Sequence, residues 1–216
     1  MSKLGELKEI LKKLIAIPSV TGNEHDIAIY IADYLRQCGV DSVELQPVEG
    51  KRLNVVAHLK GEKVGPVVLL TGHMDTVAPG EGWRTDPFKA TERDGRIYGR
   101  GAADMKGGNA AILVAIRNAA AQREQMRGEA IIAFVCDEEA YSKGVDALIR
   151  SGIRADYGIA AEPEWDAVIG AVGKMLIKVR VYGIAAHGSQ PEKGINAVEE
   201  GRRIYDNIRK AIQFLL

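Results

Sequence analysis

The residues of this chain that could do chemistry are one histidine and a series of acids, each placed just after an apolar or glycine-rich run. In chain order they are His73, Asp75, Asp104, Asp137, Glu138, Glu139 and Glu162. Imidazole and carboxylate groups are ligands that divalent ions of the zinc class take in catalytic sites. The pattern therefore favours a divalent-metal site over a chemistry carried by a single residue.

Three apolar runs deliver most of these residues, and each is typical of a strand. They are Val67–Leu70, Ala130–Cys136 and Tyr157–Ala161. A short apolar run bounded by turn residues is typical of a buried strand. Open α/β sheets carry their chemistry at the carboxyl ends of the strands. We therefore expect these three strand ends to form the site together.

The segments around the three runs predict the rest of the fold. Apolar residues at helical spacing predict helices over 4–15, over about 105–122 and from about 145, and two further strands are expected over 40–45 and 53–59. Thr21 and Glu24 have the spacing of a capping box, which would open a second helix that Gly39 stops. Turn signals include Asp94-Gly95. This alternation predicts an α/β fold with a largely parallel sheet and helices on both faces.

The pattern changes near residues 170–174, where we place a domain boundary at about 173. Residues 175–182 alternate as in a half-exposed strand, and an amphipathic helix begins at about Asn196. The chain would thus comprise a first domain over 1–173 and the start of a second over 174–216. One strand and one helix are too little to bury a core of their own.

Composition gives no sign of a nucleic-acid or membrane partner. The 216 residues include 29 Lys+Arg and 29 Asp+Glu, so the chain has no excess positive charge that would attract nucleic acid or an anionic membrane. Two cysteines do not make a disulfide framework, and Cys136 is most simply a buried thiol. The N-terminus lacks the continuous apolar stretch of a signal peptide, and no apolar run has membrane-spanning length. We therefore expect a cytoplasmic protein.

A set of motifs, in the same order along the chain, resembles one enzyme family. They are GHMDTV at 72–77, Trp83 with Asp86-Pro87-Phe88, DGRIYGRGAADMKG at 94–107, Asp137-Glu138-Glu139, Glu162-Pro163, Gly183 to Pro191 around Ala186-His187, and Gly194–Ala197. The family is that of acetylornithine deacetylase, succinyl-diaminopimelate desuccinylase, aminoacylase and glutamate carboxypeptidase. Its members are co-catalytic metallopeptidases that act on amide bonds. The resemblance implies a phosphorylase/hydrolase-like catalytic domain followed by an α+β lid domain.

The resemblance also implies a ligand set. Asp104 matches the carboxylate that bridges two metal ions, usually zinc, with cobalt or manganese as alternatives. His73 and Glu162 match ligands of one ion, and Glu139 matches a ligand of the other. Asp75 matches a residue that accepts the second imidazole N–H of His73 and so fixes its tautomer.

The same resemblance implies a mechanism and a substrate class. Glu138 matches a general base that takes a proton from the metal-bridging water and passes it to the leaving amine. His187 matches a histidine that stabilises the oxyanion and, in dimeric relatives, reaches the partner's site. The substrate would be an N-acyl amino acid or a small peptide, and a complete chain would form a homodimer.

Each assignment has an alternative without chemistry. His73 could be a structural histidine at a strand end, and Asp104 could be a helix N-cap. The acidic run after Cys136 could be a solvated loop, and Glu162 could belong to a plain turn. The ordered series of acids favours the metal site.

The main departure from the family is length, because relatives are nearly twice as long. Relatives carry a late histidine that completes the second metal's ligands, and no histidine follows His187 here. The chain therefore resembles a truncated family member. Three hypotheses remain open: an amide hydrolase of this family, a non-catalytic metal-binding remnant, and an interaction module that docks a partner carrying the missing half.

Overall fold

The computed structural model describes residues 2–163, 166, 168–170 and 178–215. The chain divides into two compact units, Met1–Ala167 and Val168–Leu216, and each is described by itself. The boundary expected at about residue 173 lies outside the described residues, as do the first residues of the strand expected over 175–182.

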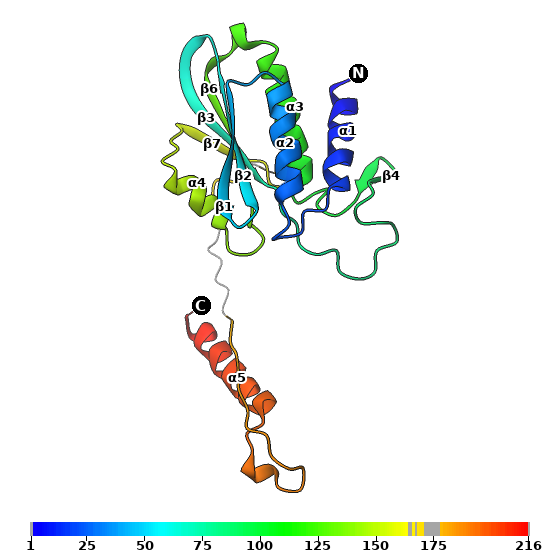
Figure 1. Ribbon diagram of the computed structural model, residues 1–216, viewed down its shortest axis with the longest axis vertical. Coiled ribbons are helices and arrows are strands. Elements are labelled where there is room, and N and C mark those ends of the chain that lie inside the picture. The colour runs from blue at the N-terminus through cyan, green and yellow to red at the C-terminus, as the bar shows by residue number, and fades with distance from the viewer. Residues whose placement is uncertain (1, 164–165, 167, 171–177, 216) are drawn as a thin grey trace. The chain divides into compact units, whose positions relative to one another are not determined.

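The first unit is built on a five-stranded sheet with the order β1-β2-β6-β3-β7 (Figure 1). The strands are β1 Ser42–Glu49, β2 Arg52–Lys60, β3 Lys63–His73, β6 Arg127–Val135 and β7 Tyr157–Ala160. Strands β6, β3 and β7 pair in parallel, whereas β1 pairs with β2, and β2 with β6, in the antiparallel sense. The expected α/β class and the strand pair at 40–45 and 53–59 are confirmed, and the parallel part of the sheet is confined to three strands.

The register of the parallel strands brings their carboxyl ends to one edge of the sheet. His73 of β3 pairs with Val135 of β6, and Thr71 of β3 pairs with Ala160 of β7. The backbone N–H of Met74 extends the first pairing, donating to the carbonyl of Val135 at 2.8 Å. The residues that follow the three strands therefore leave the sheet side by side, as expected from the sequence.

Helices cover both faces of this sheet (Figure 1). They are α2 His25–Gln37 and α3 Lys106–Ala120 over one face, with α1 Lys3–Ala16 packed against α3, and α4 Lys143–Arg150 over the other. Alternate residues of β6 serve the two cores: Phe134 faces the larger cluster with the first three helices, and Ile131 faces the smaller one with Leu148 of α4. Full burial of such a side chain contributes about 1.5–3 kcal/mol, so β6 anchors both layers.

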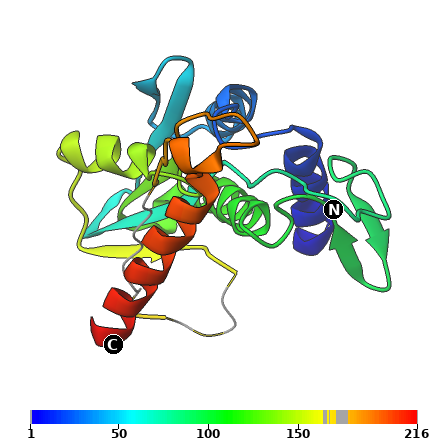
Figure 2. The ribbon, with the colours of Figure 1, turned by 90° about the horizontal axis from the view of Figure 1, so that it is seen from below.

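A small hairpin stands beside the first helix (Figure 2). It consists of β4 Thr91–Arg93 and β5 Arg96–Tyr98, and Lys8 of α1 pairs with Glu92 in it. Its turn is Asp94-Gly95, as expected, with φ of 52° and 71°. Two successive residues in the left-handed region are what a type I′ hairpin turn requires.

The expected capping box is wrong, although its helix exists. Helix α2 begins at His25, and Glu24 makes no side-chain cap at its N-terminus. The Thr21 hydroxyl donates to the Asp75 carboxylate instead, and the Glu24 carboxylate pairs with Arg52. Both side chains satisfy buried charged groups from elsewhere in the chain, a stronger demand than that of an exposed helix end.

Two of the apolar runs are less buried than their composition suggests. Residues 67–70 are half-buried, and β7 is exposed, with Ile159 56% accessible. Strand β7 lies at the edge of the sheet. The helix α4, with eight residues, covers only part of the sheet face on which it packs. Apolar composition alone therefore did not distinguish central from edge strands.

The second unit contains the short 3-10 helix η2, Pro191–Lys193, and the helix α5, Ala197–Leu215. The amphipathic helix expected from about Asn196 is thus confirmed. Of the expected strand, residues 178–182 are described and have no strand assignment, while Ile184 and Ile195 form an isolated antiparallel bridge. Every helix in the described ranges is too short or too polar to cross a bilayer.

Candidate metal centre

His73 is the last residue of β3, and its ring is almost fully buried. Its Nδ1 lies 2.8 Å from the carbonyl oxygen of Asp75. A carbonyl can only accept, so Nδ1 carries a proton, and loss of the second ring proton would leave Nε2 with a lone pair. Nε2 faces acids: it lies 2.9 Å from Oδ1 of Asp104 and 3.9 Å from Oε2 of Glu162. This orientation suits a metal ligand.

The structure brings three of the predicted ligands together. His73, Asp104 and Glu139 each offer one ligand atom, and these atoms lie within 4.8 Å of one another. They come from the end of β3, from the residues just before α3 and from the turn after β6. Asp104 and Glu139 also line a cavity of about 190 Å³. Glu162, which follows β7, approaches this group through its 3.9 Å contact with the imidazole.

The electrostatics of the cluster are those of a site short of positive charge. Burial raises the pKa of Glu139, and the charge of Asp104 raises it further. Burial also raises the pKa of Glu162, against the opposing effect of His73. Burial lowers the pKa of His73, but its hydrogen bond to Asp104 and the charges of nearby carboxylates outweigh this and raise it. A divalent cation would relieve this crowding of carboxylates, so the residues present fit a metal ion.

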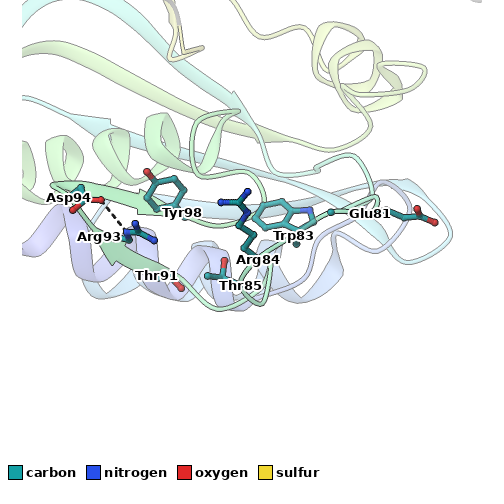
Figure 3. Close-up of a pocket in the computed structure, with 9 residues that line it drawn as sticks. Glu81, Trp83, Arg84, Thr85, Thr91, Arg93, Asp94 and Tyr98 are labelled. Atoms are coloured by element: carbon teal, nitrogen blue, oxygen red, sulfur yellow. Dashed lines mark hydrogen bonds and ion pairs between the residues drawn. The ribbon is translucent and has the colours of Figure 1, made fainter.

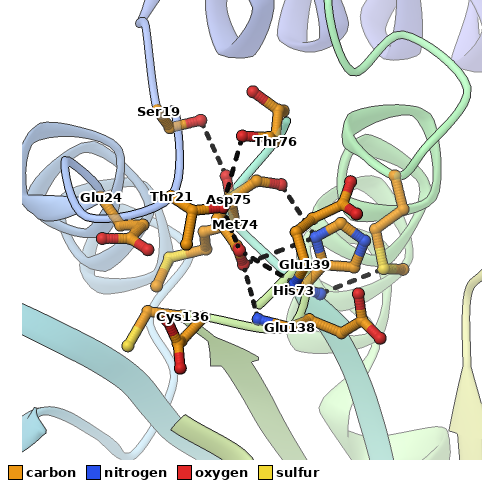
Figure 4. A network of polar contacts seen from close by, with 12 residues as sticks. Ser19, Thr21, Glu24, His73, Met74, Asp75, Thr76, Cys136, Glu138 and Glu139 are labelled. Carbon is orange, nitrogen blue, oxygen red and sulfur yellow. Dashed lines mark hydrogen bonds and ion pairs between the residues drawn. The ribbon is translucent and has the colours of Figure 1, made fainter. Parts of the chain in front are cut away.

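Asp75 accepts the imidazole N–H as expected, but through its backbone carbonyl rather than its carboxylate (Figure 4). Its fully buried carboxylate lies 3.7 Å from Nδ1 of His73, and the imidazole contact is made by its backbone carbonyl. The carboxylate binds the acidic turn: Oδ1 accepts from the Glu138 N–H at 3.0 Å, and Oδ2 accepts from the Glu139 N–H at 3.1 Å. These two donors and the Thr21 hydroxyl satisfy the Asp75 carboxylate, and the Asp75 carbonyl accepts the hydrogen bond from the His73 ring.

The turn after β6 is held by Asp137, whose φ of 69° lies in the left-handed region. One carboxylate oxygen of Asp137 lies 2.8 Å from Nη1 of Arg52, and the other accepts from the Lys143 N–H at 3.1 Å. Its carbonyl accepts from the Ser142 N–H at 2.7 Å. The conformation costs energy in a non-glycine residue, and these bonds hold it in place. No motif or spacing around Arg52 predicted this contact with the turn.

Asn109 of α3 and Met105, which caps the N-terminus of that helix, contact the backbone of His73. The Asn109 side-chain amide donates to the His73 carbonyl at 2.6 Å, and the His73 N–H lies 3.0 Å from the sulfur of Met105. A Cβ on Gly72 would lie 2.2 Å from Oδ1 of Asn109 and 2.6 Å from Cε of Met105, so a side chain here would displace both. The glycine of the GHMDTV motif thus lets α3 approach the strand that carries the histidine.

His187 belongs to the second unit, where its Nδ1 lies 2.8 Å from the Ser189 hydroxyl oxygen. Its expected contact with the reacting group stays a prediction.

A larger cavity, of about 470 Å³, lies between the loop that carries Trp83 and the β4–β5 hairpin (Figure 3). Trp83, Arg84, Arg93 and Tyr98 contribute to its wall, and none of the described residues that line it belongs to the predicted site. Arg100, which lines the smaller cavity with Asp104, lies 5.3 Å from the Trp83 ring centroid. Of the two cavities, the smaller one is lined by predicted ligands, Asp104 and Glu139.

Comparison with known proteins gives a family match and several similar solved structures. A family model described as peptidase family M20/M25/M40 matches residues 69–212. Human carnosine dipeptidase 1 is similar, with 25% identity and a TM-score of 0.63 over 72% of this chain and 38% of that chain. An M20 family metallo-carboxypeptidase from Sulfolobus solfataricus has 25% identity and a TM-score of 0.64 over 72% and 37%. Aminopeptidase PepT from Bacillus cereus has 26% identity and a TM-score of 0.60 over 92% and 55%.

The matches cover less than two thirds of each of these proteins, between 37% and 55% of their length.

Proposed function

The chain belongs to peptidase family M20/M25/M40, and from this premise we propose that it contributes the metal centre of a hydrolase that cleaves an amide bond in a small peptide or an N-acyl amino acid. The observation that carries the proposal is the convergence of His73, Asp104 and Glu139, whose ligand atoms lie within 4.8 Å of one another. An imidazole and two carboxylates from three separate elements form a preorganised site for a divalent cation.

Asp104 contacts His73 and lies within the cluster that includes Glu139. Of the proposed ligands, it would be the one that two metal ions share. We propose that His73 and Glu162 complete one side and Glu139 the other, with zinc as the metal. A bound divalent ion would polarise the scissile carbonyl and lower the pKa of a water molecule at the centre.

Glu138 is the proposed general base. Its backbone N–H is bound by the buried Asp75 carboxylate, beside that of the ligand Glu139. Its side chain therefore starts from a fixed point next to the cluster. In this role it takes a proton from the attacking water and delivers it to the nitrogen of the leaving amine. His187, supplied by this chain or by a second copy in a homodimer, would stabilise the oxyanion.

The names of the matched structures support a peptide substrate. They are a dipeptidase, a carboxypeptidase and an aminopeptidase. Removal of an acyl group from an amino acid, as in a deacetylase or desuccinylase, breaks the same kind of bond and uses the same residues. An assay with both a dipeptide and an N-acetyl amino acid distinguishes these substrate classes.

Metal content tests the site itself. We expect the protein to bind at least one zinc-class ion per chain, and His73→Ala to lose it, because the mutation removes the single nitrogen ligand of the cluster. His25→Ala is the matched control, since His25 is exposed and contacts the Lys51 carbonyl. Elemental analysis after dialysis measures the difference. Equal metal content in the parent protein and His73→Ala would contradict the assignment of His73 as a metal ligand.

Turnover tests the role of Glu138. We expect Glu138→Gln to keep its metal but to hydrolyse substrate about 10²–10⁴-fold more slowly, which is the usual contribution of a positioned proton shuttle. Loss of metal in this variant would exchange the roles of Glu138 and Glu139. A parent protein that binds metal but hydrolyses neither substrate would favour a metal-binding remnant.

A further inference from the structure

The segment before α2 runs alongside the residues that follow β3 (Figure 4). Val20 and Thr76 form a parallel bridge, the Thr76 N–H donates to the Ser19 carbonyl at 2.9 Å, and the Thr21 N–H donates to the Thr76 carbonyl at 3.1 Å. The Ser19 hydroxyl adds a bond to the Met74 carbonyl at 2.8 Å. Residues more than fifty positions apart thus form a short two-stranded support next to His73.

The Thr21 hydroxyl has two acceptors within reach. Oδ2 of Asp75 lies at 2.9 Å, and the Thr76 carbonyl oxygen, which already accepts the Thr21 N–H, lies farther away at 3.5 Å. Oδ2 of Asp75 also accepts the Glu139 N–H, while the other carboxylate oxygen accepts the Glu138 N–H. Asp75 has no exposed surface, so its carboxylate depends on protein donors. The third donor, from a separate segment, fixes the orientation of the carboxylate.

A second link joins the same segment to the same turn. Glu24 is fully buried and accepts from Nε of Arg52 at 2.9 Å, while Nη1 of Arg52 lies 2.8 Å from Asp137. The segment before α2 is therefore linked to the acidic turn twice, by Thr21 through Asp75 and by Glu24 through Arg52. Neither link is a contact with a proposed ligand atom.

We propose that Thr21 is a positioning residue of the centre. Its hydroxyl orients the Asp75 carboxylate, and that carboxylate sets the backbone positions from which Glu138 and Glu139 extend. The inference rests on the proposed function for the roles of those two glutamates. It assigns Thr21 to the site, where its sequence context pointed only to a helix cap.

The first test needs no metal. Thr21→Val keeps the side-chain shape and removes the hydroxyl. In the metal-free protein we expect the backbone amides of Glu138 and Glu139 to exchange about tenfold faster by NMR, with the larger effect at Glu139, which shares its acceptor oxygen with Thr21. Thr21→Ser restores the hydroxyl and should restore slow exchange. Unchanged exchange at both amides, or equal acceleration at core amides such as Ala57, would overturn the inference.

The second test measures zinc affinity by competition with a chelator. Thr21→Val should bind about 10–100-fold more weakly, the usual effect of losing a residue that orients a ligand, and Thr21→Ser should bind like the parent. Thr91→Val is the control, since its hydroxyl donates to the Lys89 carbonyl just before the hairpin. Equal affinity of Thr21→Val and the parent would overturn the inference. A parent protein without zinc affinity would contradict the proposed function, and amide exchange would still decide the role of Thr21.

Discussion

Arg52, which is outside the proposed ligand set, joins two buried acids of the first unit. Its side chain, 11% exposed, binds two carboxylates that are almost fully buried, those of Glu24 and Asp137. Burial lowers its pKa, but hydrogen bonds to both partners outweigh this and keep the pKa raised. Two acids share one cation, so the arginine cannot be removed without leaving buried negative charge.

We predict that Arg52→Met destabilises the first unit by about 3–5 kcal/mol, because breaking a buried pair leaves the partner charge uncompensated. Arg150→Met is the control, since Arg150 is 77% exposed and pairs with Asp146 within α4. An exposed pair is worth about 0–1 kcal/mol. Urea denaturation gives both values. If the two variants lose similar stability, the buried cluster does not support the turn as described.

At the scale of elements, the centre depends on how closely α3 approaches the end of β7. Asp104 lies just before this helix, and Glu162 follows the strand. Gly108, in the first turn of α3, faces the Ala161 carbonyl, and a Cβ there would lie 2.0 Å from that oxygen. The helix and the strand end can meet only because this position has no side chain, so one glycine sets the spacing between two proposed ligands.

We predict that Gly108→Ala destabilises the protein and weakens zinc binding. Alanine favours a helix over glycine by about 1 kcal/mol, but overpacking costs about 1–3 kcal/mol, and the clash with backbone cannot be relieved by a rotamer change. Gly158→Ala on β7 is the control, since nothing lies within 4 Å of its added Cβ. Thermal unfolding and zinc titration follow the two effects. A Gly108→Ala protein as stable as the parent would show that α3 can move without cost.

At the scale of the whole molecule, the core of the first unit ends beneath the acidic turn at Cys136. Its thiol is fully buried, and burial, followed by the charge of Glu24, raises its pKa to about 12. In the unfolded chain the thiol titrates near its ordinary value of 9.0. The stability that the neutral thiol contributes is therefore complete below about pH 9 and is lost as the pH rises through the folded value.

We predict that the free energy of unfolding falls more steeply between pH 9 and 12 in the parent than in Cys136→Ala, by up to about 1.4 kcal/mol per pH unit. The alanine variant loses packing energy at every pH, which shifts its curve without changing the slope. Tyr34, with a pKa raised to about 12, and Lys106, with a pKa lowered to about 8, affect both proteins equally. Urea titrations across this range measure the slopes, and parallel curves would contradict the burial of this thiol.

Local pattern in the sequence was enough to predict the α/β class and the proximity of His73, Asp104 and Glu139. Apolar runs that end in His73, Glu139 and Glu162 indicate strands with acids at their carboxyl ends, and parallel pairing must bring such ends to one edge. Asp104 before a helix completes the cluster that the structure contains. These features follow from periodicity and strand geometry, which neighbouring residues encode.

Only the tertiary structure decided how the site is held. Thr21 and Glu24 fit a helix cap by spacing, yet their partners are Asp75 and Arg52. Those partners lie 54 and 28 residues away along the chain, and hydrogen bonds across such distances leave no periodic trace in the sequence. The Asp75 carboxylate accepts from two backbone N–H groups of the acidic turn rather than from the imidazole. Every residue except proline carries a backbone N–H, so the side-chain sequence does not reveal which of these groups will be the donors.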